Sequence, residues 1–317
     1  MVDSKQQWKA WLYLSPAIVL LLIFTVWPIF NTIKMAFLED YNYLDDMMGI
    51  QFSFGFKNFA KVIEVKGFLT CLKNTMLLCV ITVPLSTFIA LLIAVCLNSI
   101  KPLNRLLQTI YFLPYVTNSI AIGMVFAAMF NQIGLDPQTG VATTAGIVNN
   151  ILGVFGISPV NWVNVGSTYT ANITVLVIYI VWNALPFKIL ILLGGLQSVN
   201  KQYYDAAKID GTSRARTFWR ITVPLLSPMI AYVIITGFIG GFKEYSSVVG
   251  IFSDAMGPAG DPEKVLGGRL NTMVGYIYKS ITNQQQGRAS AAALILFGII
   301  LVVTLINLYV SKKRVHY

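Results

Sequence analysis

Residues 200–228 read NKQYYDAAKIDGTSRARTFWRITVPLLSP and form a polar stretch between two very apolar ones. Its cations are Lys201, Lys208, Arg214, Arg216 and Arg220, and its only anions are Asp205 and Asp210. Loops with an excess of Lys and Arg stay on the cytoplasmic side of a membrane. The stretch therefore predicts two membrane spans joined by a cytoplasmic loop, residues 197–222.

The placement of glycine predicts two short helices within this loop. Residues 203–209 are good helix formers, and Gly211 follows where a helix would end in the left-handed conformation. Thr212 or Ser213 can then cap a second helix that runs to about Ile221.

Two short helices broken by a glycine make a compact projection. Ala206 and Ala207 offer it a small flat contact, while Tyr204, Phe218 and Ile221 offer apolar anchors. An ordinary amphipathic surface loop would show the same charge and glycine pattern, so that alternative stays open on these residues alone.

The composition places the chain in a membrane. Of its 317 residues 56% are hydrophobic and only 11% are charged, whereas about a quarter of the residues of a soluble domain are charged. We expect an all-α integral membrane protein with six transmembrane helices, because six apolar stretches can each cross a hydrocarbon core of about 30 Å. Pro224 falls in the first turn of the fifth span, where its missing N–H costs nothing. The expected spans are residues 11–37, 74–97, 106–130, 172–196, 223–252 and 289–310.

The first span begins like a secretory signal peptide, with Lys5 and Lys9 ahead of an apolar run. The run is too long for the core of such a peptide, and Trp27 and Pro28 stand where a cleavage site needs small residues. We expect this helix to stay in the protein.

The distribution of charge predicts that both chain ends are cytoplasmic. With that orientation the outer segments are electrically balanced, and the inner segments hold most of the net charge of +10. Such an asymmetry signals topology rather than nucleic-acid binding, so we expect no nucleic-acid partner. The inner cations are Lys5, Lys9, Lys101, Arg105, Lys201, Lys208, Arg214, Arg216, Arg220, Lys312, Lys313 and Arg314, and the inner anions are Asp3, Asp205 and Asp210.

Three outer loops, residues 38–73, 131–171 and 253–288, are long and rich in Gly, Asn and Pro. They are too short for separate stable domains. They can hold short helices, which we expect at residues 59–65 and 147–155.

The sequence lacks the motifs of an enzyme. No GxxxxGK[ST], GxSxG or HExxH motif is present, so the chain cannot itself cradle ATP phosphates. The single histidine is His316, and Cys71, Cys79 and Cys96 match no metal or redox spacing. We expect a conduit with no catalytic residue, no metal and no cofactor of its own.

Polar side chains within the predicted spans mark a candidate solute pathway, because they are costly to bury in a bilayer. Amides and carboxylates can hydrogen-bond the hydroxyls of a sugar, and aromatic rings can stack on its C–H faces. Hydrogen bonds between helices and ordinary packing are the alternatives, and both stay open. The candidates are Tyr115, Asn118, Tyr179, Trp182, Asn183, Phe242, Glu244 and Tyr245.

Charged side chains within the spans need partners. Lys243 follows Phe242 directly and precedes Glu244, but neighbours on a helix point about 100° apart, so Lys243 is a poor partner for that carboxylate. Lys243 can instead snorkel to the outer interface. Lys188 lies deeper, and it either snorkels toward the cytoplasmic surface or pairs inside the bundle.

The stretch DAAKIDG (residues 205–211), followed by Ile221, Pro224 and Pro228, resembles the EAA loop of ABC importer permeases. That loop reads E-A-A, three residues, G, then I and L-P, and in the family it is the coupling helix that docks into a groove of a cytoplasmic ATPase. The chain departs from the pattern at Asp205, which is one methylene shorter than the family Glu and keeps its charge. The resemblance implies a role in ATPase coupling for nine residues: Tyr204, Asp205, Ala206, Ala207, Asp210, Gly211, Phe218, Ile221 and Pro224.

Further stretches are similar to the carbohydrate-uptake branch of these permeases, the maltose, lactose and multiple-sugar type. They are TIYFLPYVTNSIAIGMVFAAMFN (109–131), WNALPFKILILLGGLQSV (182–199), GYIYKSI (275–281) and GRASAAALILFGIILVVTLI (287–306). The resemblance covers nearly the whole chain and is weakest between residues 252 and 272.

The resemblance implies one permease domain, residues 1–317, in a prokaryotic cell membrane. The implied partners are a second permease subunit, an ATPase dimer that binds ATP and Mg, and an extracytoplasmic binding protein that delivers an oligosaccharide or related glycoside. Importers of a non-sugar solute, secondary transporters, channels and membrane-embedded enzymes are the rivals. A secondary transporter needs acidic groups near the midplane, where only Glu244 qualifies, and an enzyme lacks its nucleophile.

Overall fold

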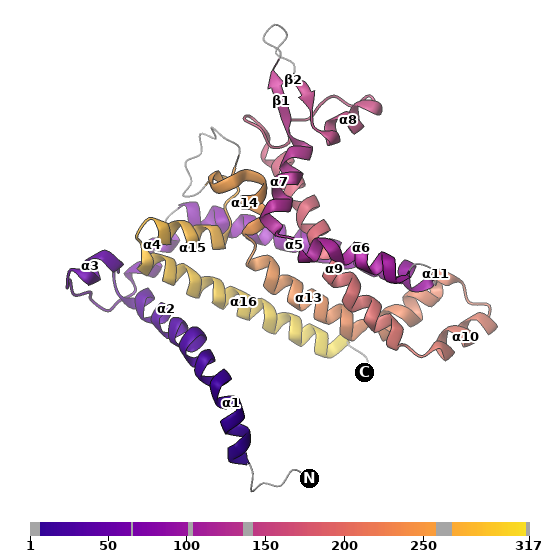
Figure 1. The fold of residues 1–317 in the computed structure, drawn as a ribbon, viewed down its shortest axis with the longest axis horizontal. Coiled ribbons are helices and arrows are strands. Elements are labelled where there is room, and N and C mark those ends of the chain that lie inside the picture. The colour runs from indigo at the N-terminus through magenta and orange to yellow at the C-terminus, as the bar shows by residue number, and fades with distance from the viewer. Residues whose placement is uncertain (1–6, 65, 101–103, 136–141, 258–267, 315–317) are drawn as a thin grey trace. The chain divides into compact units, whose positions relative to one another are not determined.

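The computed structural model describes residues 7–64, 66–100, 104–135, 142–257 and 268–314, where the regular structure is helical apart from one β-hairpin (Figure 1). Four helices in these ranges are long and apolar enough to cross a membrane. Two bent helix pairs also qualify if each counts as one span, so the described part holds up to six spans, the number that the sequence predicts. The four single helices are Trp8–Phe37, Gly67–Ser99, Tyr169–Ser198 and Gln286–Lys313.

The chain divides into two compact units. The first contains residues 1–65 and 277–297, and the second contains residues 66–276 and 298–317. The single permease domain expected from the sequence stays a prediction. The last boundary falls inside a continuous helix, α16 (Gln286–Arg314), which contributes residues to both units.

The first unit begins with an apolar rod. α1 (Gln7–Leu21) continues through a π-helical turn, η2 (Leu22–Val26), into α2 (Trp27–Phe37). No residue of the rod's most apolar window is buried within the chain. An apolar helix with no buried face in its own chain suits a lipid or protein environment outside it.

Short helices follow the rod in the first unit. α3 spans Tyr43–Met47, and α4 spans Lys57–Glu64, which confirms the helix expected at residues 59–65 with a start two residues earlier. The end of α15 (Met273–Thr282) also belongs to this unit.

Asn58 on α4 fixes the end of α2. Its amide donates to the carbonyl oxygens of Ala36 and Leu38 at 3.1 and 2.7 Å and accepts from the N–H of Asp40 at 3.2 Å. The residue is only 1% exposed. It therefore satisfies carbonyl groups at the C-terminus of α2 that have no partner within the helix.

Asp40 adds an ion pair at the same place. Its carboxylate pairs with Lys57 at 2.8 Å and with Lys61. Hydrogen bonds from these two lysines hold the pKa of Asp40 below its ordinary value of 3.8. This stabilisation is present above the unfolded pKa and is lost as the pH falls through the lower folded pKa. It amounts to less than about 1 kcal/mol, because the groups are half exposed.

We expect Asn58→Leu to lower the free energy of unfolding by about 2 kcal/mol or more, because it leaves buried carbonyl groups without a donor. The measurement is thermal unfolding of the purified protein in detergent. Asn283→Leu, a change at an exposed asparagine of the same unit, is the control and should leave the transition in place. Equal transitions for both variants would show that Asn58 does not fix the end of α2.

Three long helices frame the second unit. α5 (Lys66–Ser99) and α9 (Tyr169–Ser198) lie side by side, and α13 (Ser227–Phe242) packs against both (Figure 1). One buried cluster joins the three helices. Its residues on α5 and on α9 are spaced three and four apart, which places them on one face of each of these helices, while Val233 on α13 and Leu226 just before it complete the cluster. Its members are Ala90, Leu91, Ala94, Leu97, Ile189, Leu192, Leu193, Leu196, Leu226 and Val233.

The third predicted span, residues 106–130, is not one helix. It is divided into α6 (Asn104–Val116) and α7 (Ser119–Phe130), which are bent by 103°. The bend occurs at Asn118, whose side chain accepts from the N–H groups of Ile120 and Ala121 at 2.9 and 3.4 Å. The asparagine thus caps a new helix inside the apolar run.

The fifth predicted span, residues 223–252, is also divided. α12 (Val223–Leu225) ends at a 68° bend before α13, and α13 ends before α14 (Ser246–Phe252). Pro228 lies in the first turn of α13, where the chain has no N–H to continue the preceding helix. The single-helix interpretation of this stretch is wrong because hydropathy does not register such breaks.

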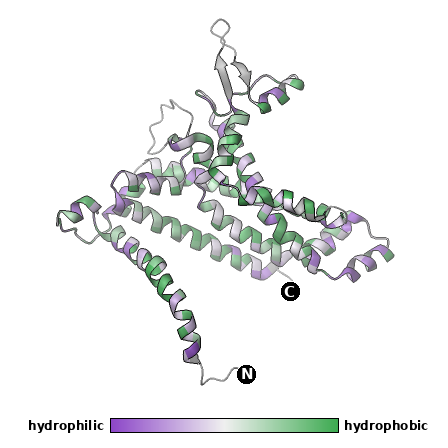
Figure 2. Cartoon of the chain, in the orientation of Figure 1, coloured by the Kyte–Doolittle hydropathy of each residue, from purple (hydrophilic) through white to green (hydrophobic). Residues whose placement is uncertain are grey.

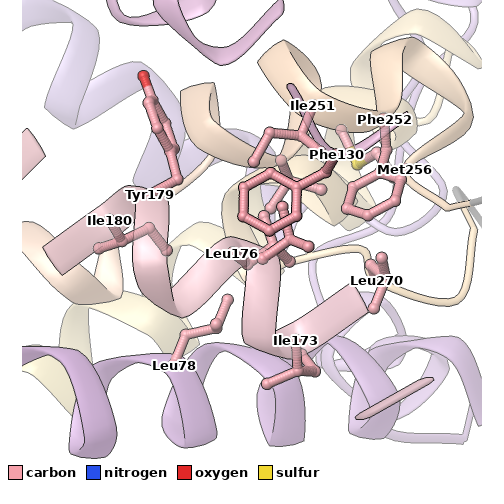
Figure 3. Close-up of a cluster of buried hydrophobic side chains, with 12 residues drawn as sticks. Leu78, Phe130, Ile173, Leu176, Tyr179, Ile180, Ile251, Phe252, Met256 and Leu270 are labelled. Carbon is pink, nitrogen blue, oxygen red and sulfur yellow. The ribbon is translucent and has the colours of Figure 1, made fainter. Parts of the chain in front are cut away.

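A second buried cluster surrounds the first half of α9 (Figure 3). Leu176 and Ile180 of α9 lie among Phe130 of α7 and Ile251 and Phe252 of α14. The second unit thus holds its divided spans together by apolar packing.

α7 and α14 cross where each has a glycine. A Cβ atom added to Gly123 would lie 2.7 Å from the Cα of Gly250, so only glycine permits this separation.

The outer loops of the second unit hold further short elements. α8 (Ile147–Val154) confirms the helix expected at residues 147–155. The antiparallel strands β1 (Gln132–Leu135) and β2 (Ala142–Ala145) and the 3-10 turn η4 (Ser253–Ala255) were not predicted. Residues 258–267, in the stretch of weakest resemblance, lie outside the described residues.

Candidate functional site

The 197–222 loop folds as two short helices in the second unit. α10 (Lys201–Ile209) is capped by Asn200, whose side chain accepts from the N–H of Gln202 at 3.0 Å. Gly211 follows with φ = 66°, so the left-handed end expected there is confirmed. Ser213 caps α11 (Arg214–Thr217), which continues through the π-helical turn η3 (Phe218–Thr222) into α12.

Several of the residues predicted for ATPase coupling face their own chain. Ala207 is only 5% exposed. Tyr204 is half-buried, and its hydroxyl accepts from Thr222 at 3.4 Å. Phe218 and Ile221 are half-buried as well, as is Pro224 at the start of α12. These residues fix the loop to the rest of the second unit.

A different set of side chains faces outward. Ala206, Asp205, Asp210 and Gly211 are exposed, as predicted for a contact surface. Of the predicted alanine pair, Ala206 alone is available for contact. Asp205 pairs with Lys208 at 3.1 Å on the surface, a bond that adds little stability there.

Three apolar side chains in the loop are exposed, and none of them was predicted as a contact residue from the sequence. Tyr203 is 54% exposed, Ile209 87% and Trp219 59%. Figure 2 shows that α10 and α11 are among the most hydrophilic helices of the chain, so these three stand out. The helical spacing of Tyr203, Ala206 and Ile209 around the buried Ala207 was the signal that could have found them.

A cavity of about 290 Å³ lies in the second unit between α5, α6, α9 and α13. It brings together three of the predicted pathway residues, Tyr115, Asn183 and Glu244. The ring of Tyr115 stacks on Phe187, which also lines the cavity, with centroids 5.8 Å apart and planes inclined by 18°. The other polar lining residues are Thr82, Ser86, Lys188 and Thr236.

The remaining pathway candidates lie elsewhere. Asn118 caps α7, and Tyr179 is fully buried with its hydroxyl donating to the carbonyl of Ser119. Trp182 packs its ring 5.2 Å from Phe126. Phe242 is 2% exposed, and Tyr245 packs against the second cluster. These residues do not line the cavity, and their place in a solute pathway stays a prediction.

Glu244 is not on a helix. It lies between α13 and α14, and its carboxylate accepts from the N–H of Ser247 at 3.0 Å in the first turn of α14. A carboxylate at a helix N-terminus is stabilised by the free N–H groups there. Glu244 therefore has this donor as well as its place in the cavity wall.

Lys188 is buried within the bundle instead of snorkelling to a surface. The residue is 5% exposed. Its ammonium group donates to the carbonyl of Val83 at 3.1 Å and to the hydroxyls of Ser86 and Thr87 at 2.7 and 2.9 Å, all on α5. Of the two alternatives for Lys188, the structure shows the one inside the bundle.

One wall of the cavity has almost no side chains. Gly237, Gly240 and Gly241 line the cavity. Because Gly240 and Gly241 follow Gly237 by three and four residues, the three glycines lie on one face of α13. A Cβ atom on Gly237 would lie 3.2 Å from the nitrogen of Lys188, and one on Gly241 would lie 2.8 Å from the sulfur of Cys79. A Cβ atom on Gly240 would meet nothing within 4 Å, so open space adjoins that residue.

Comparison with known proteins shows to which family this chain belongs. Residues 84–316 match the family described as binding-protein-dependent transport system inner membrane component. The chain belongs to this family. It is the permease component of an ABC transporter in an inner membrane, and it is not itself catalytic. Among the described residues, no group of three or more His, Cys, Asp and Glu is placed to hold a metal ion.

The permease has relatives with different named solutes. It is 30% identical over 314 residues to the arabinooligosaccharides transport system permease protein AraP of Halalkalibacterium halodurans, covering 97% of this chain and 89% of that protein. It is 27% identical over 309 residues to the sn-glycerol-3-phosphate transport system permease protein UgpA of Agrobacterium fabrum, covering 97% and 96%.

The fold also matches a solved structure. A bacterial alginate ABC transporter in complex with an alginate pentasaccharide-bound periplasmic protein contains a chain with a TM-score of 0.76 and 22% identity, covering 98% of this chain and 96% of that one.

We expect Gly240→Leu to reduce solute uptake by the assembled transporter roughly tenfold or more, equivalent to about 1.4 kcal/mol, because the new side chain would fill part of the open space in the cavity. The measurement is uptake in cells or proteoliposomes. Gly298→Leu, which also adds a side chain at an open glycine of a long helix, is the matched control and should transport normally. Normal uptake by Gly240→Leu would exclude this cavity from the solute pathway.

Proposed function

We propose that the permease forms half of the membrane channel of an ATP-driven importer that takes up a carbohydrate, an oligosaccharide or related glycoside. The other half is a second permease subunit, which we take to be a different chain. An extracytoplasmic binding protein delivers the solute, in keeping with the family's description. The arabinooligosaccharide and alginate names among the relatives support the solute class.

The orientation follows from the charge asymmetry. Both chain ends and the 197–222 loop face the cytoplasm of a prokaryotic cell, because the basic segments stay inside. The cavity then lies between the outer end of α13, at Glu244, and the level of Lys188. A solute that enters from outside reaches Glu244 before Lys188.

ATP and Mg bind to a separate ATPase dimer, because this chain has no phosphate-binding loop. The 197–222 loop docks on that ATPase. The observation that carries this proposal is the exposure of Tyr203, Ile209 and Trp219 on an otherwise hydrophilic loop. Apolar side chains exposed in a polar surround are typical of protein–protein contact sites.

The solute class rests on the chemistry of the cavity. Tyr115 and Phe187 form an aromatic surface on which the C–H face of a sugar can stack. Asn183, Thr236 and Glu244 bring donors and acceptors for hydroxyl groups to the same space. ATP binding closes the ATPase dimer, the loop transmits the movement, and the two permease halves expose the cavity to one side of the membrane at a time.

A phosphorylated, non-sugar solute is the second candidate. The relative named for sn-glycerol-3-phosphate supports it, and so does the buried cation Lys188 in the cavity wall. A channel or a secondary transporter is disfavoured by the family assignment.

We expect Ile209→Asp to weaken ATPase association by about 2 kcal/mol or more, roughly thirtyfold, because it places a charge at a central apolar contact. Ala206→Glu should act in the same direction. Both side chains are exposed, so the permease itself should fold. Co-purification of the ATPase and ATP-driven uptake are the measurements.

The matched control is Ile157→Asp, the same change at a half-exposed isoleucine of an outer loop. This variant should keep its ATPase. If Ile209→Asp and Ala206→Glu also keep theirs, the loop is not the docking site. Ala207→Glu is a poorer test, because Ala207 is buried in its own chain and the change would disturb folding as well.

For the solute, we expect the cognate binding protein and transporter, reconstituted with a panel of mono- and oligosaccharides, to take up at least one oligosaccharide in an ATP-dependent manner. sn-Glycerol-3-phosphate and amino acids serve as non-sugar comparisons. ATP-dependent uptake of a non-sugar alone would overturn the carbohydrate assignment and leave the importer assignment intact.

A further inference from the structure

Lys188 presents a buried charge that its neighbours hydrogen-bond but do not neutralise. Its three N–H donors are occupied by one carbonyl and two hydroxyl oxygens of α5. No carboxylate lies within ion-pair distance of Lys188 in the described part of the chain, where the ion pairs involve only lysines and aspartates outside the cavity. The hydrogen bonds are therefore complete, and the charge has no counter-ion.

Such an arrangement is costly inside a membrane. An ammonium group in a low-dielectric environment loses its hydration energy, and neutral oxygens restore only part of it. Methionine or leucine would pack between α5 and α9 without that cost. A cation kept at this depth is thus a functional-site candidate whose partner has to be named.

The cavity gives this charge an accessible side. Lys188 lines the cavity. The absence of a side chain at Gly237 lets the backbone of α13 approach its nitrogen, because a Cβ atom there would lie 3.2 Å from that nitrogen and 3.0 Å from Cγ1 of Val83. Ser86 lines the same cavity. Its Oγ accepts from Lys188 at 2.7 Å and donates to the carbonyl of Thr82 at 2.5 Å, so it keeps the Thr82 partner when it loses the bond from the ammonium group. A ligand oxygen can then take the place of the Ser86 hydroxyl on the ammonium group.

The other charge of the cavity is Glu244, in the loop between α13 and α14. Gly237 lies five residues, roughly 7.5 Å at 1.5 Å per residue, before the last residue of α13, Phe242, and Glu244 comes two residues after that end. Its carboxylate is held by the first turn of α14, so it does not act as the counter-ion of Lys188. Between them, Gly240 adjoins open space, which leaves room for a ligand beside α13.

Building on the carbohydrate importer proposed above, we propose that the cavity binds a saccharide that carries one anionic group, a carboxylate or a phosphate, and that Lys188 receives this group. The ligand supplies the missing counter-ion, and its oxygens accept from the ammonium group. Its hydroxyls meet Asn183, Thr236 and Glu244 farther along the glycine wall, and one ring stacks on Tyr115.

The test measures equilibrium binding to the purified permease–ATPase complex without the binding protein, so that the binding protein's own selectivity does not enter. The probes are a galactose trisaccharide with one terminal galacturonate, the matching neutral galactose trisaccharide, glucose 6-phosphate and glucose. We expect each anionic probe that fits to bind about tenfold or more tightly than its neutral match. The uronate and phosphate arms distinguish the two sources of the anionic group.

Lys188→Met should abolish this preference while the neutral probe binds as before, and Lys188→Arg should retain it. Lys243→Met removes the same charge from an exposed lysine outside the cavity lining, and it should leave the preference unchanged. Co-purification of the ATPase reports that each variant assembles. If Lys188→Met does not assemble, the wild-type comparison and Lys188→Arg still decide the question.

The outcomes separate the two proposals. Binding of neutral saccharides without preference for the anionic ones, or an equal loss for both in Lys188→Met, overturns the role of Lys188 and leaves the carbohydrate importer standing. Failure of all saccharides to bind, in a complex that still hydrolyses ATP, counts against the carbohydrate assignment itself.

Discussion

The structure depends on one constraint: inside a bilayer each backbone N–H and C=O group must find a partner within the protein. Continuous helices such as α5 and α9 meet it without help. Where a helix begins or ends, a side chain hydrogen-bonds the backbone groups that have no partner within the helix. Asn118 accepts from the first N–H groups of α7, and Glu244 accepts from the first turn of α14. In the first unit, Asn58 serves the carbonyl groups at the end of α2.

Two of these interruptions lie beside the cavity of the second unit. Since α6 ends at the bend before Asn118 and α13 ends before Glu244, the ends of these helices carry Tyr115 and Glu244 to the cavity between α5 and α9. Polar groups that terminate helices and polar groups that face the cavity therefore lie close together along the chain. Glu244 belongs to both sets, which ties the start of α14 to the wall of the cavity.

Local signals were sufficient for much of this architecture. Gly211 and Ser213 correctly predicted the break between the two short helices of the 197–222 loop, because the residues at a helix end determine where the helix stops or starts. The breaks at Asn118 and before α14 were missed, because in a hydropathy average the long apolar runs on both sides outweigh the few polar residues at each break. The environment of Lys188 could not be predicted, since its partners on α5 are about a hundred residues away. Likewise, composition does not reveal that Ala207 faces inward and Ile209 outward.

The bare face of α13 has a further consequence. A wall formed by backbone has no rotamers with which to adjust, so its contour changes only when the helix moves as a body. Any displacement of α13 therefore alters the width of the cavity directly, with no side chain to absorb it. The three glycines differ in what they face. Gly237 and Gly241 lie close against Val83, Lys188 and Cys79, whereas the hydrogen atom in place of a side chain at Gly240 leaves open space beside the helix.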